Sequence, residues 1–441
     1  MSSLKSLAQQ ILVSVERLEA AHAGSDTQPP PVGGTFKPTV TPEAERASRD
    51  VILAATQLLA SVRSPMEMIM ETCTGMFSVA AMNFVNEHNI ADILQEAGPK
   101  GLPAKEIGAK IGADGTQVGR ALRFLSTRFV FREVEPNVFA NNKHSAILLK
   151  NKPVSELVAD PVAKYDNAPA AAVAAIFTDE TFMASRSIPQ FLKDPGNFRS
   201  PFSIALNDNT DMFAWFNKPE NAASGRRFAA GWKGLGDRHP PELFTSAIDW
   251  KALEAGSTVV DVGANVGTVT LFLAKAFPHL RYIVQDLEFV INKTAKSFWS
   301  ENCPEAITDG LVELQVHDFF KVMPITADIY FMRFVIHDWP EVDAMRIMKN
   351  VRAAAQPSSK LILFENVIPQ ANFEESEASP SASNGEANTA HYMTMIDLQM
   401  MTMQGGRERT IVEFTELGNV CGWKLDSVKP GKLYALVFVP A

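Results

Sequence analysis

The sequence predicts an α/β fold in its C-terminal part, preceded by a mainly helical N-terminal part. From about residue 256, apolar strand-like segments alternate with helical ones, as in a parallel sheet buried on both faces. The last two strand-like segments are joined by Pro430-Gly431, which is too short for a crossover helix, so this pair is expected to be antiparallel. Before residue 250, most apolar residues recur at helical spacing.

The first 90 residues are expected to form helices interrupted by one linker. Residues 24–42 are rich in Pro and Gly and predict that linker. Further helices are expected from about Pro42 and from about Pro65 to His88. The opening helix needs a surface for its apolar stripe, either in its own domain or on a partner subunit. That stripe consists of Leu4, Leu7, Ile11, Val15 and Leu18.

Residues 90–145 predict a winged helix. Two short helices are expected in "LPAKEIGAKIG" and "TQVGRALRFLSTR", and two strands in "FVFREVEPNVFANN", joined at Pro136-Asn137. Residues 100–150 hold nine Lys or Arg and four Asp or Glu, so this region is locally basic. A DNA-binding use therefore stays open beside a use in packing and dimerisation.

The chain is expected to comprise three parts. Residues 1–150 hold the N-terminal helices and the winged helix, and residues 151–250 form a helical connecting region rich in aromatic side chains. Residues 251–441 hold the α/β domain, whose strands are expected in "STVVDVG", "LRYIVQD", "LVELQVHD", "ADIYFMRFV", "KLILFENVI" and the final pair. Within it, the acidic stretch 371–390 is expected to be a mobile surface loop.

Composition excludes several classes of function. The net charge of -9 argues against general affinity for nucleic acid or anionic membranes. Charges interrupt the apolar stretches at the N-terminus, so no secretory signal is expected, and no uninterrupted apolar run reaches the roughly 18 residues of a membrane span. Three scattered cysteines suit a reducing cytoplasm, and neither they nor the eight histidines form a metal-binding motif.

A nucleoside site is expected where the first strands of the sheet end. In "VVDVGANVGTVT", Gly263 and Gly267 permit a sharp turn and the close approach of a ligand. Asp286 follows Gly267 by 19 residues, the spacing at which a carboxylate binds ribose hydroxyls. Asp318 is placed to bind the amino group of an adenine ring, and Phe319, which follows it, is placed to stack on that ring. Each aspartate taken singly is also explained as a helix cap, and the lack of a full G-x-G-x-x-G argues against NAD.

A second group of polar residues is expected at the same edge of the sheet. In "FMRFVIHDWPE" an apolar run leads into a histidine beside a carboxylate. A histidine held by carboxylates in a cleft is a general-base arrangement, whereas a satisfied histidine at a strand end is the alternative. The fourth strand brings Arg333, His337, Asp338 and Trp339 to this edge, and Glu365 follows in the fifth strand. Near the chain end, "QGGRERT" carries Arg407, Glu408 and Arg409.

Taken together, these motifs resemble those of the class I S-adenosylmethionine-dependent O-methyltransferases of the caffeic-acid type. The chain is more similar still to the fungal sterigmatocystin type, which methylates polyketide phenols. The resemblance covers nearly the whole chain, including "GRRF", "STVVDVG", "IVQDL", "MRFVIHDWP" and "GGRERT". It implies a Rossmann-like methyltransferase domain, an N-terminal dimerisation domain, S-adenosyl-L-methionine as cofactor, and a cytoplasmic homodimer of secondary metabolism acting on a phenol.

The resemblance also implies roles for individual residues. No metal is expected, because one histidine suffices as the base. His337 is the expected catalytic base, with Glu365 and Glu408 flanking and orienting it. The residues expected to contact the cofactor are Asp261, Gly263, Ala264, Gly267, Asp286, Leu287, Asp318, Phe319, Arg333 and Trp339. The residues expected near the acceptor are Trp232, Asp338, Met400 and Met403.

Three departures from the family pattern affect these expectations. Ala264 and Asn265 stand where glycines are common, but asparagine tolerates left-handed backbone, so the turn is expected to survive. Met403 stands where some plant members carry a polar substrate contact, so the substrates of the plant enzymes cannot be assigned to this chain. The helix expected at residues 391–406 carries five methionines and no Lys or Arg, which favours an apolar aromatic acceptor, although core packing explains methionines equally well.

Two rival functions remain at this stage. One is an enzyme of the same fold that binds S-adenosylmethionine but catalyses another reaction, such as a pericyclic rearrangement. The other is a DNA-binding regulator that uses the basic winged helix. The complete set of His337, Glu365 and Glu408 argues against both, because neither rival needs it.

Overall fold

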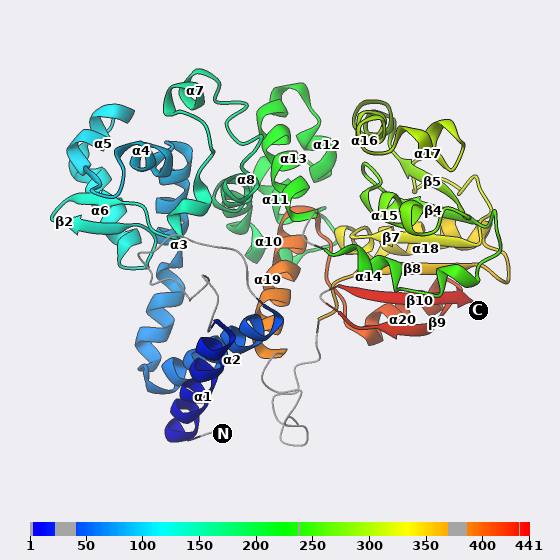
Figure 1. Cartoon of the computed structure of the whole chain (residues 1–441), viewed down its shortest axis with the longest axis horizontal. Helices are drawn as coiled ribbons and strands as arrows, with labels where there is room; N and C mark the ends of the chain where they lie inside the picture. The colour runs from blue at the N-terminus through cyan, green and yellow to red at the C-terminus, as the bar shows by residue number, and fades with distance from the viewer. Residues whose placement is uncertain (1–2, 23–40, 237–238, 369–385, 432) are drawn as a thin grey trace. The chain divides into compact units, whose positions relative to one another are not determined.

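The computed structural model describes residues 3–22, 41–236, 239–368, 386–431 and 433–441. They belong to two compact units (Figure 1). The predicted linker lies outside the described residues except for its last two positions, and so does the acidic stretch up to residue 385. The first unit comprises Met1–Lys193, Phe202–Gly236 and Asn372–Thr389, and the second comprises Asp194–Pro201, Asp237–Ala371 and Ala390–Ala441.

The first unit is mainly helical, as predicted. Helices α1 (Leu4–His22) and α2 (Pro42–Val62) pack against each other. Helix α3 (Pro65–Glu87) begins at a capping box in which Ser64 and Glu67 exchange hydrogen bonds. The other helices of this unit outside residues 100–140 are α4 (Ile90–Ala97), α7 (Val154–Ala159), α8 (Pro169–Ile176), α9 (Phe182–Ser185), α10 (Ile188–Lys193), α11 (Pro201–Leu206), α12 (Met212–Phe216) and α13 (Ala222–Gly236), with a π-helical turn at Phe177–Thr181.

Residues 100–140 form two helices and a small antiparallel sheet. The helices are α5 (Ala104–Ile111) and α6 (Gly115–Ser126), and the strands are β1 (Leu102–Pro103), β2 (Arg132–Glu135) and β3 (Val138–Ala140) in the order β1-β3-β2. The chain reverses between β2 and β3 at Pro136-Asn137, where the sequence places the turn, and Asn137 has a φ of 63°. The two helices and the strand pair expected here are therefore present.

Helix α3 corrects one expectation. It is long and apolar enough to cross a membrane, judged by length and composition only. Glu67 and Glu71 interrupt its apolar residues, so a search for an unbroken run misses it. The helix is also little buried, and Met66, Ile69 and Phe77 are exposed. A single helix of this kind is weak evidence for a membrane span, but it does leave an apolar surface to be explained.

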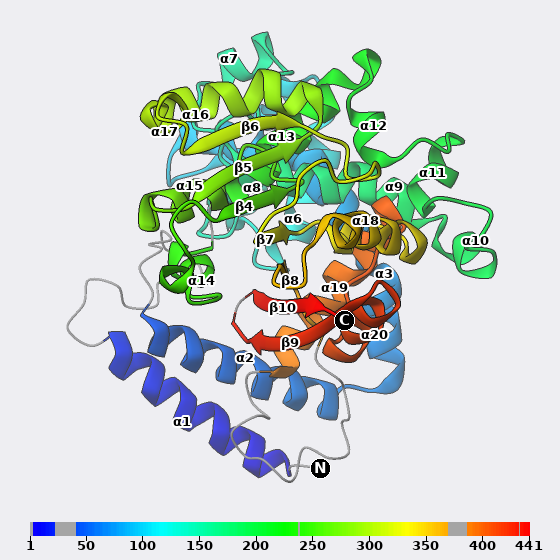
Figure 2. The ribbon, with the colours of Figure 1, turned by 90° about the vertical axis from the view of Figure 1, so that its right-hand side faces the viewer.

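The second unit is built on one seven-stranded sheet. Its order is β6-β5-β4-β7-β8-β10-β9, which Figure 2 shows from top to bottom. Strands β4 to β8 pair in parallel, and β10 is antiparallel to both β8 and β9, which confirms the predicted topology. The strands are β4 (Thr258–Val262), β5 (Arg281–Asp286), β6 (Val312–Val316), β7 (Ile329–Arg333), β8 (Lys360–Glu365), β9 (Trp423–Lys429) and β10 (Tyr434–Pro440).

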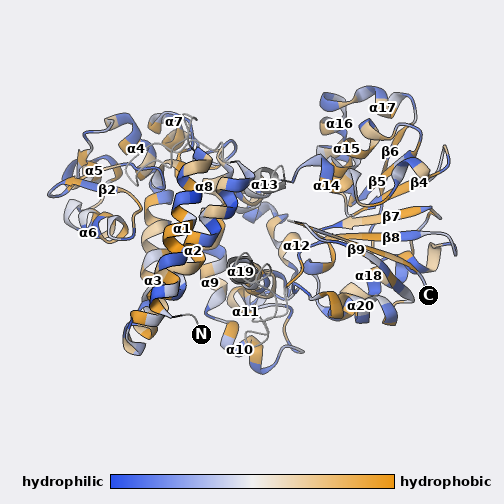
Figure 3. Cartoon of the chain, turned by 60° about the horizontal axis from the view of Figure 1, so that its bottom comes forward, coloured by the Kyte–Doolittle hydropathy of each residue, from blue (hydrophilic) through white to orange (hydrophobic). Residues whose placement is uncertain are grey.

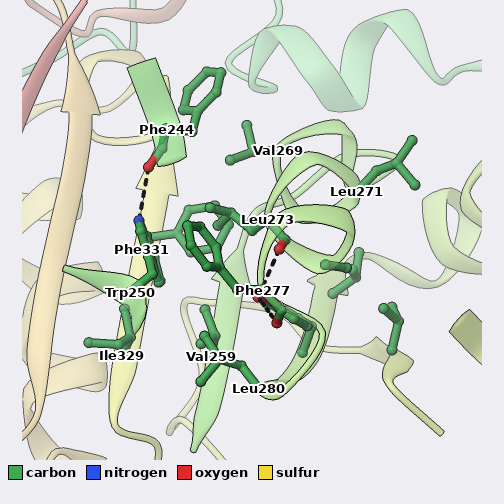
Figure 4. Close-up of a cluster of buried hydrophobic side chains, with 14 of the residues drawn as sticks. Phe244, Trp250, Val259, Val269, Leu271, Leu273, Phe277, Leu280, Ile329 and Phe331 are labelled. Carbon is green, nitrogen blue, oxygen red and sulfur yellow. Dashed lines mark hydrogen bonds between the residues drawn. The ribbon is translucent and has the colours of Figure 1, made fainter. Parts of the chain in front are cut away.

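Helices cover both faces of this sheet (Figure 3). On one face lie α14 (Pro241–Thr245), α15 (Thr268–Ala276), α16 (Lys296–Asn302) and α17 (Pro304–Thr308), which share the buried cluster drawn in Figure 4. There the Trp250 indole donates a hydrogen bond to the Phe244 carbonyl at 3.0 Å. On the other face lie α18 (Glu341–Ala354) and α20 (Ile411–Val420). Burial on both faces explains the nearly continuous apolar strands.

Helix α19 (Glu386–Gln404) begins earlier than the sequence suggests. The acidic stretch was expected to be a loop up to residue 390, and this is wrong for residues 386–390, which are helical. Good helix formers such as Glu386 and Ala387 extend the helix. It ends at Gln404. The next residue, Gly405, has a φ of 73°, and a side chain there would lie 2.0 Å from the Arg199 carbonyl oxygen. Gly405, the first glycine of "GG", is therefore required because the backbone at Arg199 approaches it closely.

Candidate active site

The loop after β7 carries the histidine. The expectation that the strand continues to Val335 is wrong, because β7 ends at Arg333. His337 lies beyond it in a single 3₁₀ turn, Ile336–Asp338. The chain leaves the strand direction at Phe334, whose φ is 54°. A left-handed backbone costs a non-glycine residue about 1–2 kcal/mol, so the surrounding contacts must hold it in place.

Glu365, the last residue of β8, holds this loop. Its Oε1 accepts hydrogen bonds from the backbone N–H groups of Val335 at 3.2 Å and Ile336 at 2.8 Å. Its side chain is fully buried, and its Oε2 lies 3.9 Å from Nδ1 of His337. Glu365 therefore fixes the backbone that presents His337, besides lying close to the imidazole itself.

The imidazole of His337 lies among three carboxylates. Its Nδ1 is 2.8 Å from Oε1 of Glu408, and its Nε2 is 3.4 Å from Oδ1 of Asp338. The side chain of Glu408 is fully buried and that of His337 is 10% exposed. Because an ionised carboxylate only accepts hydrogen bonds, Nδ1 carries a hydrogen and donates it to Glu408. In the neutral histidine this leaves Nε2 free to accept a proton.

Glu408 is itself held by several contacts. Its backbone N–H donates to Oδ1 of Asp397 at 2.8 Å, and Nδ2 of Asn366 donates to its Oε1 at 3.1 Å. The backbone N–H of Arg407 donates to the His337 carbonyl at 2.9 Å. A side chain at Gly406 would lie 2.1 Å from that same carbonyl oxygen, so only glycine lets the two segments approach. The "QGGRERT" segment is thereby fastened against the histidine loop.

The sequence analysis missed three residues of this site. Asn366 and Asp397 support Glu408, and Gln404, the last residue of α19, donates a hydrogen bond to Asp338. A weak signal existed for Asn366, which follows Glu365 directly. Asp397 and Gln404 lie on a helix expected to contribute mainly methionines, and only the folded chain brings them to the histidine.

The carboxylates dominate the electrostatics of this site. Burial lowers the pKa of His337, but the charges of Glu408, Asp338 and Glu365 more than offset it and raise the pKa to about 10. Burial raises the pKa of Glu365 to about 7, although His337 opposes the rise. Burial likewise raises the pKa of Asp338 to about 6. The site is thus a strong base surrounded by negative charge, and it suits the uptake of a proton.

The turn after β4 and the end of β5 form a second part of the site. Gly263, Asn265 and Gly267 have φ values of 71°, 54° and 82°, so Asn265 adopts the left-handed backbone expected of it. The two carboxylate oxygens of Asp286 each accept one backbone hydrogen bond at 2.7 Å, from the N–H groups of Asn265 and Leu287. Burial raises the pKa of Asp286 to about 6. The turn and the carboxylate are therefore built as one unit.

Asp261 lies beneath this turn. Its buried carboxylate accepts a hydrogen bond from the Thr270 hydroxyl at 2.7 Å. Burial raises the pKa of Asp261 to about 7, against that hydrogen bond. Ala264 packs partly on the apolar core, and its N–H donates to the Gln285 carbonyl at 3.0 Å. Both residues thus shape the turn from below.

Aromatic side chains lie beside the turn. A side chain at Gly263 would lie 3.3 Å from the ring of Phe319 and 3.1 Å from Val335. The rings of Phe319 and Phe320 pack edge-on against Trp339, with centroids 5.6 and 4.7 Å apart. Asp318 lies two residues beyond β6 rather than at its end, and its Oδ1 accepts the Phe320 N–H at 3.0 Å. The structure therefore brings Phe319 and Trp339 together near Gly263.

The remaining predicted residues divide between the two units. Arg333 ends β7, and its Nη2 lies 3.0 Å from Nδ1 of His239. Met400 and Met403 on α19 are buried, as core residues are, and Leu287 is 43% exposed. Trp232 belongs to the first unit, on α13, where its ring centroid is 5.2 Å from that of Phe228.

Three groups of this site also have the spacing of metal ligands. One ligand atom each of His337, Glu365 and Glu408 lies within 4.8 Å of the others. A histidine hydrogen-bonded directly to a carboxylate is already satisfied without an ion. The expectation of a metal-free site stays a prediction.

Similarity to known proteins covers nearly the whole chain. Residues 242–424 match the family model described as an O-methyltransferase domain. The chain is 31% identical to an O-methyltransferase of Armillaria gallica, over 97% of this chain and 95% of that protein. It is 30% identical to 4-O-methyltransferase 1 of Phanerochaete chrysosporium, over 97% and 96%. Sterigmatocystin 8-O-methyltransferase of Aspergillus parasiticus is 26% identical over 86% and 82%.

Solved structures share the fold. OxaC in complex with sinefungin and meleagrin aligns over 99% of both chains with a TM-score of 0.71 and 22% identity. A pericyclic reaction enzyme aligns over 98% of this chain and 100% of its own, with a TM-score of 0.67 and 18% identity. At these identities the likeness extends to the fold and not to the reaction.

Proposed function

Because this chain belongs to the S-adenosylmethionine-dependent O-methyltransferases, we propose that its acceptor is a phenolic hydroxyl and that His337 is the general base. The observation that carries the proposal is the 2.8 Å contact between Nδ1 of His337 and Glu408, which leaves Nε2 to receive a proton. Glu365 and Glu408 orient the imidazole and stabilise its charged form. We propose that the enzyme acts in secondary metabolism.

The turn after β4 fits the cofactor, S-adenosylmethionine. A side chain at Gly263 would crowd Val335 at 3.1 Å and Phe319 at 3.3 Å, and the φ of 71° favours glycine, so the backbone itself forms this surface. Each carboxylate oxygen of Asp286 has lone pairs left after its backbone hydrogen bond, and these suit the ribose hydroxyls. Phe319 and Trp339 offer flat apolar surfaces nearby. The cofactor supplies an electrophilic methyl group carried on a positively charged sulfur.

The proton balance favours His337 as the base. As the acceptor oxygen gains the methyl group, its O–H bond breaks and the proton moves to Nε2 of His337. An ordinary histidine, with a pKa of about 6.5, is a weak base for a phenol of pKa about 10. The carboxylates raise the pKa of His337 to about 10, so the transfer becomes nearly balanced. The imidazole must first be neutral, which predicts an alkaline optimum.

The charges of the site also bear on the acceptor. Asp338, Glu365 and Glu408 surround the base, and they repel an acceptor that carries a carboxylate. We propose that Asp338, Met400 and Met403 contact a largely apolar aromatic acceptor of polyketide or flavonoid type. The contact of Trp232 with the acceptor, which the resemblance implies, stays a prediction. A neutral polycyclic phenol should therefore have a higher kcat/KM than a small hydroxybenzoate. A tenfold preference for the hydroxybenzoate would refute this view of the acceptor.

Two other functions are less well supported. The likeness to a pericyclic reaction enzyme extends to the fold, and a pericyclic rearrangement transfers no proton to a base such as His337. A DNA-binding regulator would use the basic residues near α6. There Arg123 forms two hydrogen bonds to Glu133, at 3.0 and 3.1 Å, which lowers its availability for phosphate. Salt-dependent DNA binding at micromolar concentration would contradict this reading.

We also propose that the enzyme is a cytoplasmic homodimer formed through α1 to α3 and a winged helix at residues 90–145. Hydrophobic residues lie along all three of these helices (Figure 3), and many are exposed. A second copy would bury this surface. Light scattering at micromolar concentration is expected to give the mass of a dimer, and a fully active monomer would refute the proposal. The exposed residues include Leu12, Ile52, Leu59, Val62, Met66, Ile69, Met70, Met76 and Phe77.

The direct test of the reaction is a panel of acceptors. The purified enzyme is incubated with S-adenosylmethionine labelled with ¹³C in the methyl group and with phenols, polyketides and flavonoids. The product is mapped by NMR, which locates the new methyl group. Methylation of a phenolic oxygen is the expected result. Transfer only to carboxylate, nitrogen or aliphatic hydroxyl acceptors would contradict the proposal.

A further inference from the structure

The ring of Phe334 lies against the imidazole of His337. Their centroids are 5.1 Å apart and their planes differ by 21°, so the rings are stacked. We propose that Phe334 is a positioning residue, whose ring fixes the orientation of the His337 imidazole between Glu408 and Asp338. This inference rests on the proposed role of His337 as the base.

The backbone at Phe334 supports this role. Its φ of 54° is a conformation that favours glycine and asparagine. Among the residues that the structure describes, eight other than glycine have a positive φ, and five of them are asparagines. The other three are phenylalanines, namely Phe129, Phe131 and Phe334. Of these three phenylalanines, Phe334 is the one whose ring stacks on His337, and holding it in this conformation costs about 1–2 kcal/mol.

Contacts on several sides keep the ring in place. The Phe334 N–H donates to the Phe364 carbonyl at 3.1 Å and anchors the backbone. The Arg333 guanidinium carbon lies 5.2 Å from the ring centroid, and the His239 ring centroid is 5.6 Å away. Phe334 also packs partly on the apolar core, so a role in packing alone is the competing explanation.

Stacking by Phe334 restricts a rotation of the imidazole that the hydrogen bond to Glu408 leaves open. A single hydrogen bond at Nδ1 allows the imidazole to tilt about that bond, and Nε2 would then move away from a bound acceptor. A ring lying flat against the imidazole opposes this tilt. The negative π-face of phenylalanine also attracts the imidazolium that forms when Nε2 takes the proton. Loss of the ring should thus lower kcat rather than cofactor affinity.

Three substitutions separate this role from packing. Phe334→Leu keeps an apolar side chain and removes the ring. Phe334→Asn also removes the ring, and it lowers the strain of the left-handed backbone, which asparagine tolerates. Phe334→Tyr keeps the ring. The matched control is Phe129→Asn, since Phe129 in the first unit also has a positive φ, 62°, and is 62% exposed. Calorimetric titration with S-adenosylmethionine counts the folded sites in each preparation.

We expect kcat to fall tenfold or more in the Leu and Asn variants, with the cofactor Kd within twofold of the native value. The Tyr variant and the Phe129→Asn control should keep kcat within threefold. A Leu variant with kcat within threefold of native would overturn the proposal, as would a Tyr variant as slow as the Leu variant. If the Asn variant does not fold, the comparison of Leu with Tyr still decides.

A second measurement does not depend on activity. The ¹⁵N and ¹H signals of the His337 ring are recorded without acceptor, in the native enzyme and in the Leu and Tyr variants. We expect one set of sharp signals in the native and Tyr proteins and broadened or shifted signals in the Leu variant. Unchanged signals in the Leu variant would contradict positioning. If the native enzyme methylates no phenol but the signals differ as expected, the proposed reaction fails and the positioning role stands.

Discussion

Replacing Glu408 with glutamine tests the electrostatic account of the base. The change removes a negative charge whose Oε1 lies 2.8 Å from Nδ1 of His337, and it keeps an acceptor oxygen of similar size. At an effective dielectric constant of about 20, a pair of unit charges at this distance contributes about 6 kcal/mol, or about 4 pKa units. Asp338 and Glu365 remain in the variant and still stabilise the charged imidazole. We therefore expect the pKa of His337 to fall from about 10 by roughly 2–4 units.

The assay is the pH dependence of kcat/KM at saturating cofactor. The base must be neutral, so the native rate should rise with pH through a limb near pH 10. In Glu408→Gln this limb should move to lower pH, and the plateau rate should fall because a weaker base accepts the proton less readily. The profile is measured with two phenols of different pKa. If the rate rises because the acceptor ionises, the pH of the rise changes with the phenol. If it rises because His337 loses its proton, the pH changes with the variant and not with the phenol.

The control is Glu416→Gln, which makes the same change of charge at an exposed position on α20. Its pH profile should match that of the native enzyme. The reasoning would be refuted if Glu408→Gln still forms product and its rate rises at a pH within half a unit of that of the native enzyme. It would mean that Glu408 does not set the basicity of His337.

Two further predictions concern the cofactor side of the site. Asp286→Ala should weaken S-adenosylmethionine by about 1.5–3 kcal/mol, as for a lost hydrogen bond to a charged group, and unchanged affinity by calorimetry would remove Asp286 from the site. Burial raises the pKa of Asp261 to about 7, so ionising it costs the folded apoprotein stability as pH rises from about 4 through 7. Asp261→Asn removes that cost and should gain stability over the native apoprotein between pH 5 and 8, by up to about 4 kcal/mol in urea denaturation; a constant difference across this range would contradict the assignment.

Local patterns in the sequence were sufficient for much of the fold. Apolar strands followed by helices predict the parallel sheet, because both faces of such strands are buried. The short Pro430-Gly431 connection predicts the antiparallel final pair. The end of β7 was missed because "FMRFVI" stays apolar after the strand has stopped. Val335 and Ile336 are buried by packing in a loop, and the positive φ of Phe334 leaves no mark in the pattern of hydrophobicity.

The site divides in a similar way. His337 and Asp286 could be found because Asp286 ends one strand and His337 lies shortly after another, at the edge where parallel strands end. Glu408 lies 71 residues from His337, and its place came from the resemblance rather than from any local pattern. The contacts of Gln404 and Asp397 depend on where α19 packs, which the sequence analysis did not resolve. Tertiary contacts of this kind leave little trace in a single sequence.

The most direct test of the central claim is the rate of methyl transfer by His337→Ala. Single-turnover rates with a phenol accepted by the native enzyme are compared at the same pH, and cofactor affinity is measured by calorimetry. If His337 is the base, the variant should bind S-adenosylmethionine within a few-fold of native and transfer the methyl group about 10² times more slowly or worse. A variant that forms the same methyl ether at a near-native rate would contradict the account.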